Sequence, residues 1–224
     1  MLFRNSGAVI CTKPITLNAG GTLEFGGNNT GGAVYGFPLT LSGNVTFSSG
    51  GGTATAKNYF LTGAWSGTAA INGTAVGSDP VILVLSNNLA GWTGSFNNAG
   101  NGLRIGFSTA APGSAAVAWS LNNAGAVLET YSATSIELGS LSGNSGTLRN
   151  SGGGPATVTV GALSTSTTFG AVMADNTSSL GLVKVGTGTL TLTGNNTFSG
   201  GTIVSNGAVL VQGSTASAGS GSVT

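Results

Sequence analysis

The side chains that could perform catalysis or bind a metal are few in this chain of 224 residues. It contains no histidine and a single cysteine, Cys11, so His-based triads, Cys–His pairs and His or Cys metal clusters are excluded. We expect Cys11, which has no partner for an internal disulfide, to be a small buried apolar residue. The acidic residues are Glu24, Asp79, Glu129, Glu137 and Asp175.

Two of these carboxylates, Glu129 and Glu137, are eight residues apart and are the pair that suggests glycoside hydrolysis, which needs two neighbouring carboxyl groups. Solvated positions on strands or turns are the simpler interpretation, because carboxylates prefer the surface. The periodic Asp residues of calcium-binding repeats are absent, and Gly186-Thr-Gly188 lacks the strand–loop–helix setting of a phosphate loop. We therefore predict no catalytic, cofactor-binding or metal-binding residues, and a protein that is not an enzyme.

The composition indicates a folded all-β protein with a neutral surface. Gly is abundant at 41 residues, but the hydrophobic fraction of 40% and the net charge of +1 are unlike those of disordered chains. A surface of Ser, Thr, Asn and Gly is typical of exported proteins and favours self-association. The scattered cations argue against binding of nucleic acid or anionic membranes. They are Arg4, Lys13, Lys57, Arg104, Arg149 and Lys184.

Short alternating segments recur along the chain and are separated by Asn and Gly. Residues 39–51 align with residues 190–201 after one insertion, 23–32 is a shorter copy, and 83–94 keeps the strand, the paired Asn and the Gly. Leu, Val or Phe alternates with Thr or Ser, which places one row of side chains inside and one outside. Asn and Gly tolerate the left-handed backbone that sharp turns need.

Two architectures fit this pattern, a β-sandwich of hairpins and a parallel β-helix. Near-identical repeats favour the β-helix, with a coil of about 20 residues. Stacked Asn side chains at one corner would then form hydrogen bonds from coil to coil. No linker divides the chain, so we predict one continuous solenoid domain over residues 1–224.

Three further groups of residues have a functional and a structural interpretation, and we favour the structural one for each. The Trp residues could stack on sugars, but we expect at least two in the core. The Thr-x-Thr patterns could form a flat array for ice or glycan binding, but they fit the outer side of strands. The Asn-x-Ser/Thr triplets fit corners better than glycosylation sites. These groups are Trp65, Trp92 and Trp119; Thr157, Thr159, Thr189, Thr191 and Thr193; and Asn28, Asn44, Asn72, Asn176 and Asn195.

The stretch from Lys184 to Gly213, Lys-Val-Gly-Thr-Gly-Thr-Leu-Thr-Leu-Thr-Gly-Asn-Asn-Thr-Phe-Ser-Gly-Gly-Thr followed by Asn-Gly-Ala-Val-Leu-Val, resembles the autotransporter-associated β-strand repeat. This is the passenger-associated repeat of bacterial surface proteins. The resemblance is closest over residues 182–224 and weaker over 14–106. It implies a right-handed parallel β-helix, export from a bacterium and a structural or adhesive role, and it implies no catalytic residues.

The first functional hypothesis is therefore an extracellular, non-enzymatic solenoid that stacks head to tail into a filament or stalk. Met1-Leu-Phe-Arg4 begins without a polar cap, and Ser222-Val-Thr224 stops where another strand would begin. We expect such solenoid ends to favour pairing with another chain. The alternatives are an adhesin that binds glycans or a cell surface, and a polysaccharide-active enzyme that uses Glu129 and Glu137. Membrane insertion is not expected, because the longest run of large apolar residues is Val81–Leu85.

Overall fold

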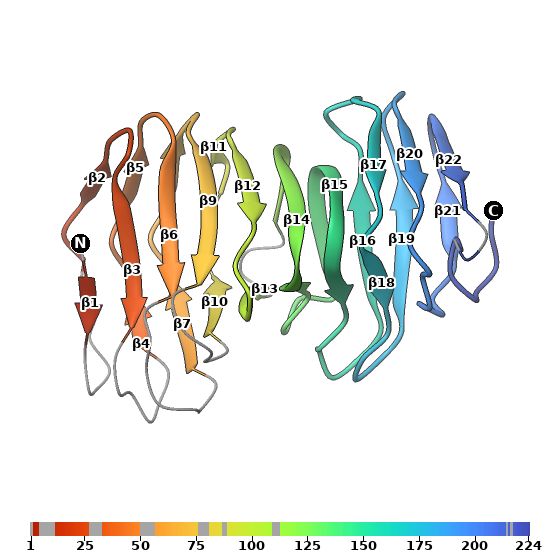
Figure 1. Ribbon diagram of the computed structural model, residues 1–224, viewed down its shortest axis with the longest axis horizontal. Helices are drawn as coiled ribbons and strands as arrows, with labels where there is room; N and C mark the ends of the chain where they lie inside the picture. Colours follow the sequence, from red (N-terminus) through yellow and green to blue (C-terminus); the bar gives the residue numbers. More distant parts are fainter. Residues whose placement is uncertain are drawn as a thin grey trace.

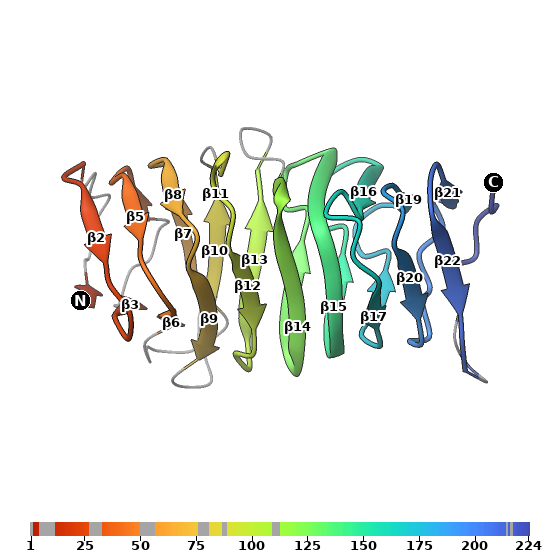
Figure 2. The same ribbon diagram turned by 90° about the horizontal axis from the view of Figure 1, so that it is seen from above.

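The computed structural model describes residues 2–4, 12–26, 33–49, 57–75, 81–86, 89–108, 113–213, 215 and 217–224. Over these residues the chain forms strands and turns without any helix, and each strand pairing is parallel. The coils follow one another along one axis as a right-handed β-helix, as Figures 1 and 2 show. The predicted β-helix is confirmed, and a β-sandwich of hairpins is excluded because hairpins pair antiparallel.

Each coil passes through three faces in the same order, and two long strands bend through all three. Face 1 contains β1 (Leu2–Arg4), β3 (Thr22–Gly26), β6 (Val45–Ser49), β9 (Ala70–Ala75), β12 (Ser95–Asn98), β17 (Thr167–Phe169), β20 (Thr189–Leu192) and β22 (Ala208–Val211). Face 2 contains β4 (Ala33–Tyr35), β7 (Lys57–Leu61), β10 (Val81–Leu85), β13 (Leu103–Phe107) and β18 (Val172–Ala174). Face 3 contains β2 (Ile15–Leu17), β5 (Leu39–Leu41), β8 (Trp65–Gly67), β11 (Gly91–Trp92), β16 (Ala156–Val160), β19 (Leu180–Lys184) and β21 (Thr202–Val204). The bent strands are β14 (Gly113–Glu129) and β15 (Ser135–Arg149).

The coils differ in length. On face 1, Val45 pairs with Ile71 and Thr189 pairs with Ala208, and the first of these pairs is separated by the longer stretch of sequence. Register shifts occur between β14 and β15, but the strand pairs β6–β9 and β20–β22 are regular, so the difference in their coil length is taken up by the corners. The predicted coil length therefore describes the last coil, which joins β19 to β21 and β20 to β22, and most of the preceding coils carry longer corners.

The core is a stack of inward side chains, and the buried aromatic ones between Phe25 and Trp119 form a continuous contact series. Phe47 contacts both Phe25 and Phe96 edge to face, with ring centroids 5.7 and 6.2 Å apart. Phe96 stacks on Trp119 at 5.4 Å and 18°. Trp65, Trp92 and Trp119 are all buried, which confirms the expectation of a core role. Such rings contribute large buried areas and favourable pair geometries, so they stabilise the stacking of coils.

Asn residues connect the coils in two ways. Asn97 Nδ2 donates to Asn72 Oδ1 at 3.4 Å, and Asn122 Nδ2 donates to Asn97 Oδ1 at 2.7 Å. The predicted Asn ladder therefore exists, but its place was wrong: it lies on strands β9, β12 and β14 of face 1 and not at a corner. Parallel pairing brings Asn72 and Asn97 side by side as register partners. Asn122 lies two positions beyond Ser120, the register partner of Asn97, and reaches Asn97 along the strand.

The corners hold a different set of Asn side chains, which are buried. Asn150 Oδ1 accepts from Thr130 Oγ1 at 2.6 Å in the preceding coil, and Asn150 Nδ2 donates to the Ser179 carbonyl at 2.8 Å in the following coil. Each such amide satisfies backbone groups of a turn that would otherwise be buried without partners. The equivalent side chains at other corners are Asn98 and Asn196.

Two glycines show how closely the backbones approach at the corners. A Cβ atom on Gly63 would overlap the carbonyl oxygen of Phe37, and one on Gly94 would overlap that of Ala69. In both cases the overlapped atom belongs to the backbone of the preceding coil and cannot rotate away. These corners therefore require glycine for close backbone contact.

The Thr-x-Thr patterns lie on different faces of the helix. Thr157 and Thr159 are on β16 in face 3, while Thr189 and Thr191 are on β20 in face 1, with Thr193 just after it. A single flat hydroxyl array over these residues was therefore a wrong hypothesis, and a place on the outer side of strands is confirmed for Thr157, Thr159, Thr189 and Thr191. Among the Asn-x-Ser/Thr triplets, Asn72 lies on β9 and Asn28 lies outside the described residues; the corner positions are Asn44, Asn176 and Asn195.

Candidate functional site

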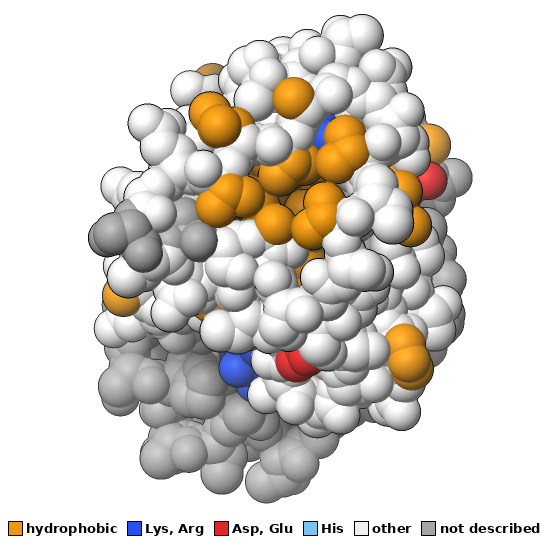
Figure 3. Space-filling view, turned by 90° about the vertical axis from the view of Figure 1, so that its right-hand side faces the viewer, with side chains coloured by type: hydrophobic (Ala, Val, Ile, Leu, Met, Phe, Trp, Pro, Cys, Tyr) orange, Lys and Arg blue, Asp and Glu red, His pale blue; other side chains and the backbone are white. Residues whose placement is uncertain are grey.

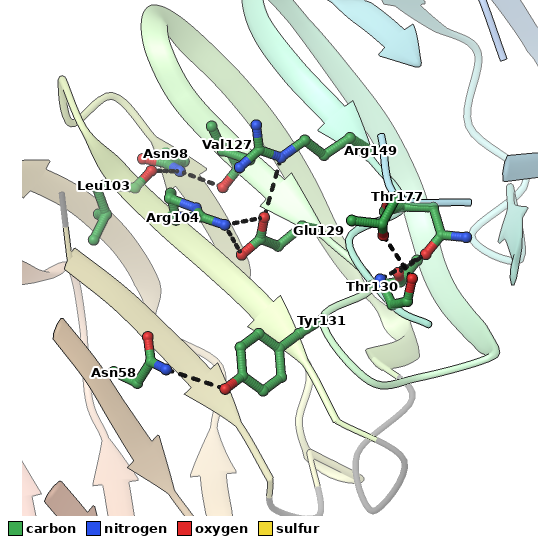
Figure 4. A network of polar contacts seen from close by, with 12 residues as sticks. Asn58, Asn98, Leu103, Arg104, Val127, Glu129, Thr130, Tyr131, Arg149 and Thr177 are labelled. Atoms are coloured by element: carbon green, nitrogen blue, oxygen red, sulfur yellow. Dashed lines mark hydrogen bonds and ion pairs between the residues drawn. The ribbon is translucent and has the colours of Figure 1, made fainter. Parts of the chain in front are cut away.

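The most charged surface in the described part of the chain is on the outside of face 2, around Glu129. The Glu129 side chain is 0% exposed. Its two carboxylate oxygens accept from Arg104 Nη2 at 2.8 and 2.7 Å, and Arg149 Nε donates to Oε2 at 3.1 Å. Figure 4 shows the two guanidinium groups converging on the carboxylate from neighbouring strands. A buried carboxylate needs such partners, because leaving water costs several kcal/mol unless charge and hydrogen bonds compensate.

Strand register brings these three residues together. Glu129 at the end of β14 pairs with Gly106 of β13 on one side and with Arg149 of β15 on the other. Arg104 lies two positions before Gly106, so its side chain also points outward and runs along the strand to the carboxylate. The sequence separation from Glu129 to Arg149, 20 residues, equals the local coil length, whereas the separation from Arg104 to Glu129, 25 residues, exceeds it by the two positions between Arg104 and Gly106. This ion-pair network was not predicted, although its coil-length spacing was a usable signal.

Tyr131 extends this surface toward the N-terminal coils. It follows Thr130 in the corner after β14 with a left-handed φ of 48°, and its Cβ lies against Gly106. The ring meets Phe60 edge to face with centroids 6.1 Å apart, and the hydroxyl accepts from Asn58 Nδ2 at 3.1 Å. Tyr131 thus reaches back over the outer side of face 2 to β7 (Figure 4).

This outer layer explains the continuous apolar run Val81–Leu85. Val81, Leu83 and Leu85 point into the core, while Ile82 and Val84 point outward and are still only 5% and 0% exposed. Val84 is next to Gly106 in the sheet, where Tyr131 lies, and Ile82 is next to Arg104. We call the outward group of Asn58, Phe60, Arg104, Glu129, Tyr131 and Arg149 the face 2 patch.

The structure separates the two carboxylates that suggested a hydrolase. Glu129 is on face 2, whereas Glu137 is exposed on the face 3 part of β15, beside Thr159 of β16. The interpretation of both as solvated was wrong for Glu129, because two arginines make its burial possible. Glu24 is half-buried on β3, and Asp79 and Cys11 lie outside the described residues.

Asp175 links two coils at the corner after β18. Its Oδ1 accepts from the amides of Leu180 and Ser199 at 2.7 and 3.1 Å, and its Oδ2 accepts from Ser199 Oγ at 2.6 Å. Burial alone raises the pKa of Asp175, but the hydrogen bonds from Ser199 and Leu180 outweigh it and lower the pKa below its usual value. The role of Asp175 in this geometry is that of a corner cap.

Lys184 occupies an inward position at the end of β19 and is 1% exposed. Its Nζ donates to the carbonyl oxygens of Val185, Gly186 (2.9 Å) and Asn206 (3.4 Å), the last in the following coil. Its neighbours in the ladder are Val160 and Val204. Burial lowers the pKa of Lys184, because the ammonium group has lost its water.

We expect Lys184→Met to remove a pH dependence of stability. Because the folded-state pKa of Lys184 is below the unfolded value of 10.5, the unfolded chain binds more protons between these two values. The free energy of unfolding of the wild type should therefore rise, relative to that of Lys184→Met, as pH approaches 10.5. Urea unfolding of both proteins at several pH values from neutral up to the unfolded pKa measures this difference.

A second buried group titrates in the same range with the opposite sign. Burial raises the pKa of Tyr59, so ionisation of the unfolded chain lowers stability above about pH 10. Tyr59 is present in both proteins and its contribution cancels in the comparison. A stability difference between wild type and Lys184→Met that is constant over this range would contradict the expected titration of Lys184.

Among the described residues, no three His, Cys, Asp or Glu side chains lie close enough together to bind a metal ion. No helix of this part of the chain has the length and apolar character required to cross a membrane.

Comparison with known protein families gives a match at the C-terminal end. Residues 182–211 match the model described as passenger-associated-transport-repeat, which confirms the resemblance predicted for this stretch. In the structure these residues run from β19 through β20 and β21 to the end of β22. Neither the comparison with curated proteins nor that with solved structures gives a match.

Proposed function

We propose that this chain is a non-enzymatic structural part of an exported bacterial surface protein, and that its solenoid stacks end to end with a second copy into a filament or stalk. The passenger-associated repeat and the β-solenoid together fit an extracellular protein of the autotransporter-passenger type. The matched repeat is itself a coil-forming unit, since its strands are the last ones of the stack. The structure does not favour the alternative of a polysaccharide-active enzyme that uses Glu129 and Glu137. The Glu129 carboxylate is bound by two arginines, and it lies on a different face from Glu137.

The observation that carries the stacking proposal is the apolar surface at the C-terminal end. Four side chains there, those of Ile203, Leu210, Val211 and Val223, are 50%, 49%, 41% and 60% exposed. Figure 3 looks onto this end and shows apolar side chains gathered there. Among the described strands β22 pairs with β20 alone, so its other edge presents unpaired backbone groups.

A second copy is the occupant that we propose for this end. A further coil stacked on this end would pair the free backbone groups of β22 and pack against the exposed side chains of Leu210 and Val211 on that strand. Net charge of +1 on 224 residues gives little repulsion between copies. Contact between the C-terminal end of one copy and the N-terminal coil of the next is heterologous, and such contacts produce open fibres.

We expect the 224-residue chain to form fibres or multimers and Leu210→Lys to abolish them. A lysine at this place puts a charge into the proposed contact, where its desolvation opposes association. Light scattering and negative-stain electron microscopy of the two proteins measure the outcome. Leu163→Lys is the matched control: Leu163 is 40% exposed but lies in the corner after β16, so this variant should still assemble. A wild-type chain that stays monomeric at high concentration would refute stacking between copies.

A further inference from the structure

The face 2 patch combines two features that are scarce elsewhere in the described part of this protein, partly exposed aromatic rings and clustered charge. Among the aromatic side chains that the structure describes, Phe60 and Tyr131 alone are not buried. They contact each other on the outer side of face 2, where Glu129 and its two arginines also lie. The two features occur on neighbouring coils and are joined through Gly106, which pairs with Glu129 and lies under Tyr131.

The charge of the patch is unbalanced toward the positive. Two guanidinium groups, always protonated, face a single carboxylate. The Arg149 side chain is 26% exposed and uses only Nε for Glu129, so both of its terminal nitrogens lack a hydrogen-bond acceptor in the described part of the chain. Arg104 Nε is buried and has no partner there either. Planar guanidinium groups with free donors suit carboxylate and sulfate groups, which accept two parallel hydrogen bonds.

The rings next to these donors are held in place. Tyr131 is fixed at one end by the strand corner and at the other by the bond from Asn58 Nδ2 to its hydroxyl. A ring that is already ordered loses little entropy on binding, and its apolar face suits the C–H face of a sugar. Rings beside a few convergent polar groups are also the general composition of ligand sites.

We infer that the face 2 patch binds an acidic polysaccharide, with the carboxylate or sulfate group at Arg149 and a sugar ring against Tyr131. Glu129 positions both arginines and does not touch the ligand. A polymer that lies across the coils would extend from Arg149 on β15 over β13 to Phe60 on β7. This binding is independent of end-to-end stacking, because the patch is on the side of the solenoid and the apolar surface is at its end.

Binding of the 224-residue chain to immobilised polysaccharides tests the inference. Polygalacturonate supplies carboxylates, dextran sulfate supplies sulfates and dextran is the neutral comparison. We expect binding to at least one of the two anionic polymers and none to dextran. Arg149→Gln should weaken the binding about tenfold or more, the effect of losing a charged hydrogen-bond donor. Which anionic polymer binds more tightly distinguishes the carboxylate from the sulfate.

Two further variants separate a specific site from simple charge attraction. Lys13→Gln removes the same charge at an exposed position outside the patch and should change binding less than twofold, in contrast to Arg149→Gln. Tyr131→Ala keeps all charges but removes the ring, and it should also weaken polysaccharide binding. This variant tests the inference on its own if Arg149→Gln does not fold. Absence of binding to both anionic polymers, equal losses in Arg149→Gln and Lys13→Gln, or unchanged binding in Tyr131→Ala would each overturn the inference.

Discussion

Trp119→Ala should destabilise the solenoid more than other single truncations of its core. The Trp119 ring stacks on Phe96 and also meets Trp92 and Phe107 edge to face, with centroids 6.3 and 5.2 Å away. It therefore joins side chains of neighbouring coils. Truncation removes these contacts and leaves a cavity that the rigid stack of strands cannot close, at a cost of about 3–5 kcal/mol. Urea unfolding followed by circular dichroism measures the loss.

Trp119→Phe is the control that separates volume from aromatic contact. Phenylalanine keeps a ring in the stack, and it also removes Nε1, a buried donor without a partner among the described residues. We expect the free energy of unfolding to fall by less than half as much in Trp119→Phe as in Trp119→Ala. The side-chain volume removed is smaller, and a buried donor without a partner disappears. Equal losses in the two variants would show that the aromatic series does not stabilise coil stacking.

Glu129→Gln should cause the second largest loss of stability, although it replaces only one carboxylate oxygen by an amide nitrogen. The uncharged amide leaves Arg104 and Arg149 facing each other without a negative charge between them. Breaking a buried ion pair from one side costs about 3–5 kcal/mol. We expect about 2–3 kcal/mol here, because the two arginine side chains are 22% and 26% exposed and keep part of their hydration. Urea unfolding of the variant and the wild type measures the difference.

Glu137→Gln provides the matched control for this prediction. It makes the same chemical change at an exposed position on face 3. Its urea midpoint should stay close to that of the wild type, since isolated surface charges contribute little. A Glu129→Gln variant as stable as Glu137→Gln would mean that the three-residue ion-pair network does not stabilise the coils.

Much of the fold followed from local sequence pattern, because alternation along a strand decides which side chains point inward. Leu39-Thr-Leu41 on β5 and Thr189-Leu-Thr-Leu192 on β20 alternate in burial as their residue types do. Asn and Gly between such segments predicted the turns. The core position of the Trp residues followed from their large apolar rings, and the absence of histidine by itself limited the available chemistry.

The candidate site was only partly predictable, because the partners of an outward side chain belong to other coils. Glu129 was assigned to solvent from its residue type, yet the lengths of the two adjoining coils bring Arg104 and Arg149 to its carboxylate. Lys184 likewise lies in the core, where carbonyl groups of two coils surround its ammonium group. Neither environment has a signature within a single strand.

The sequence by itself therefore determined the type of coil, its inward and outward rows and its C-terminal passenger-associated repeat. The tertiary structure alone decided which residues of different coils meet, including the face 2 patch and the Asn ladder on face 1. The physical reason is that alternation depends on adjacent residues, whereas register between coils depends on corner length. Corner length differs between the coil that joins Val45 to Ile71 and the one that joins Thr189 to Ala208, and a shift of one position reverses which side chains share a face.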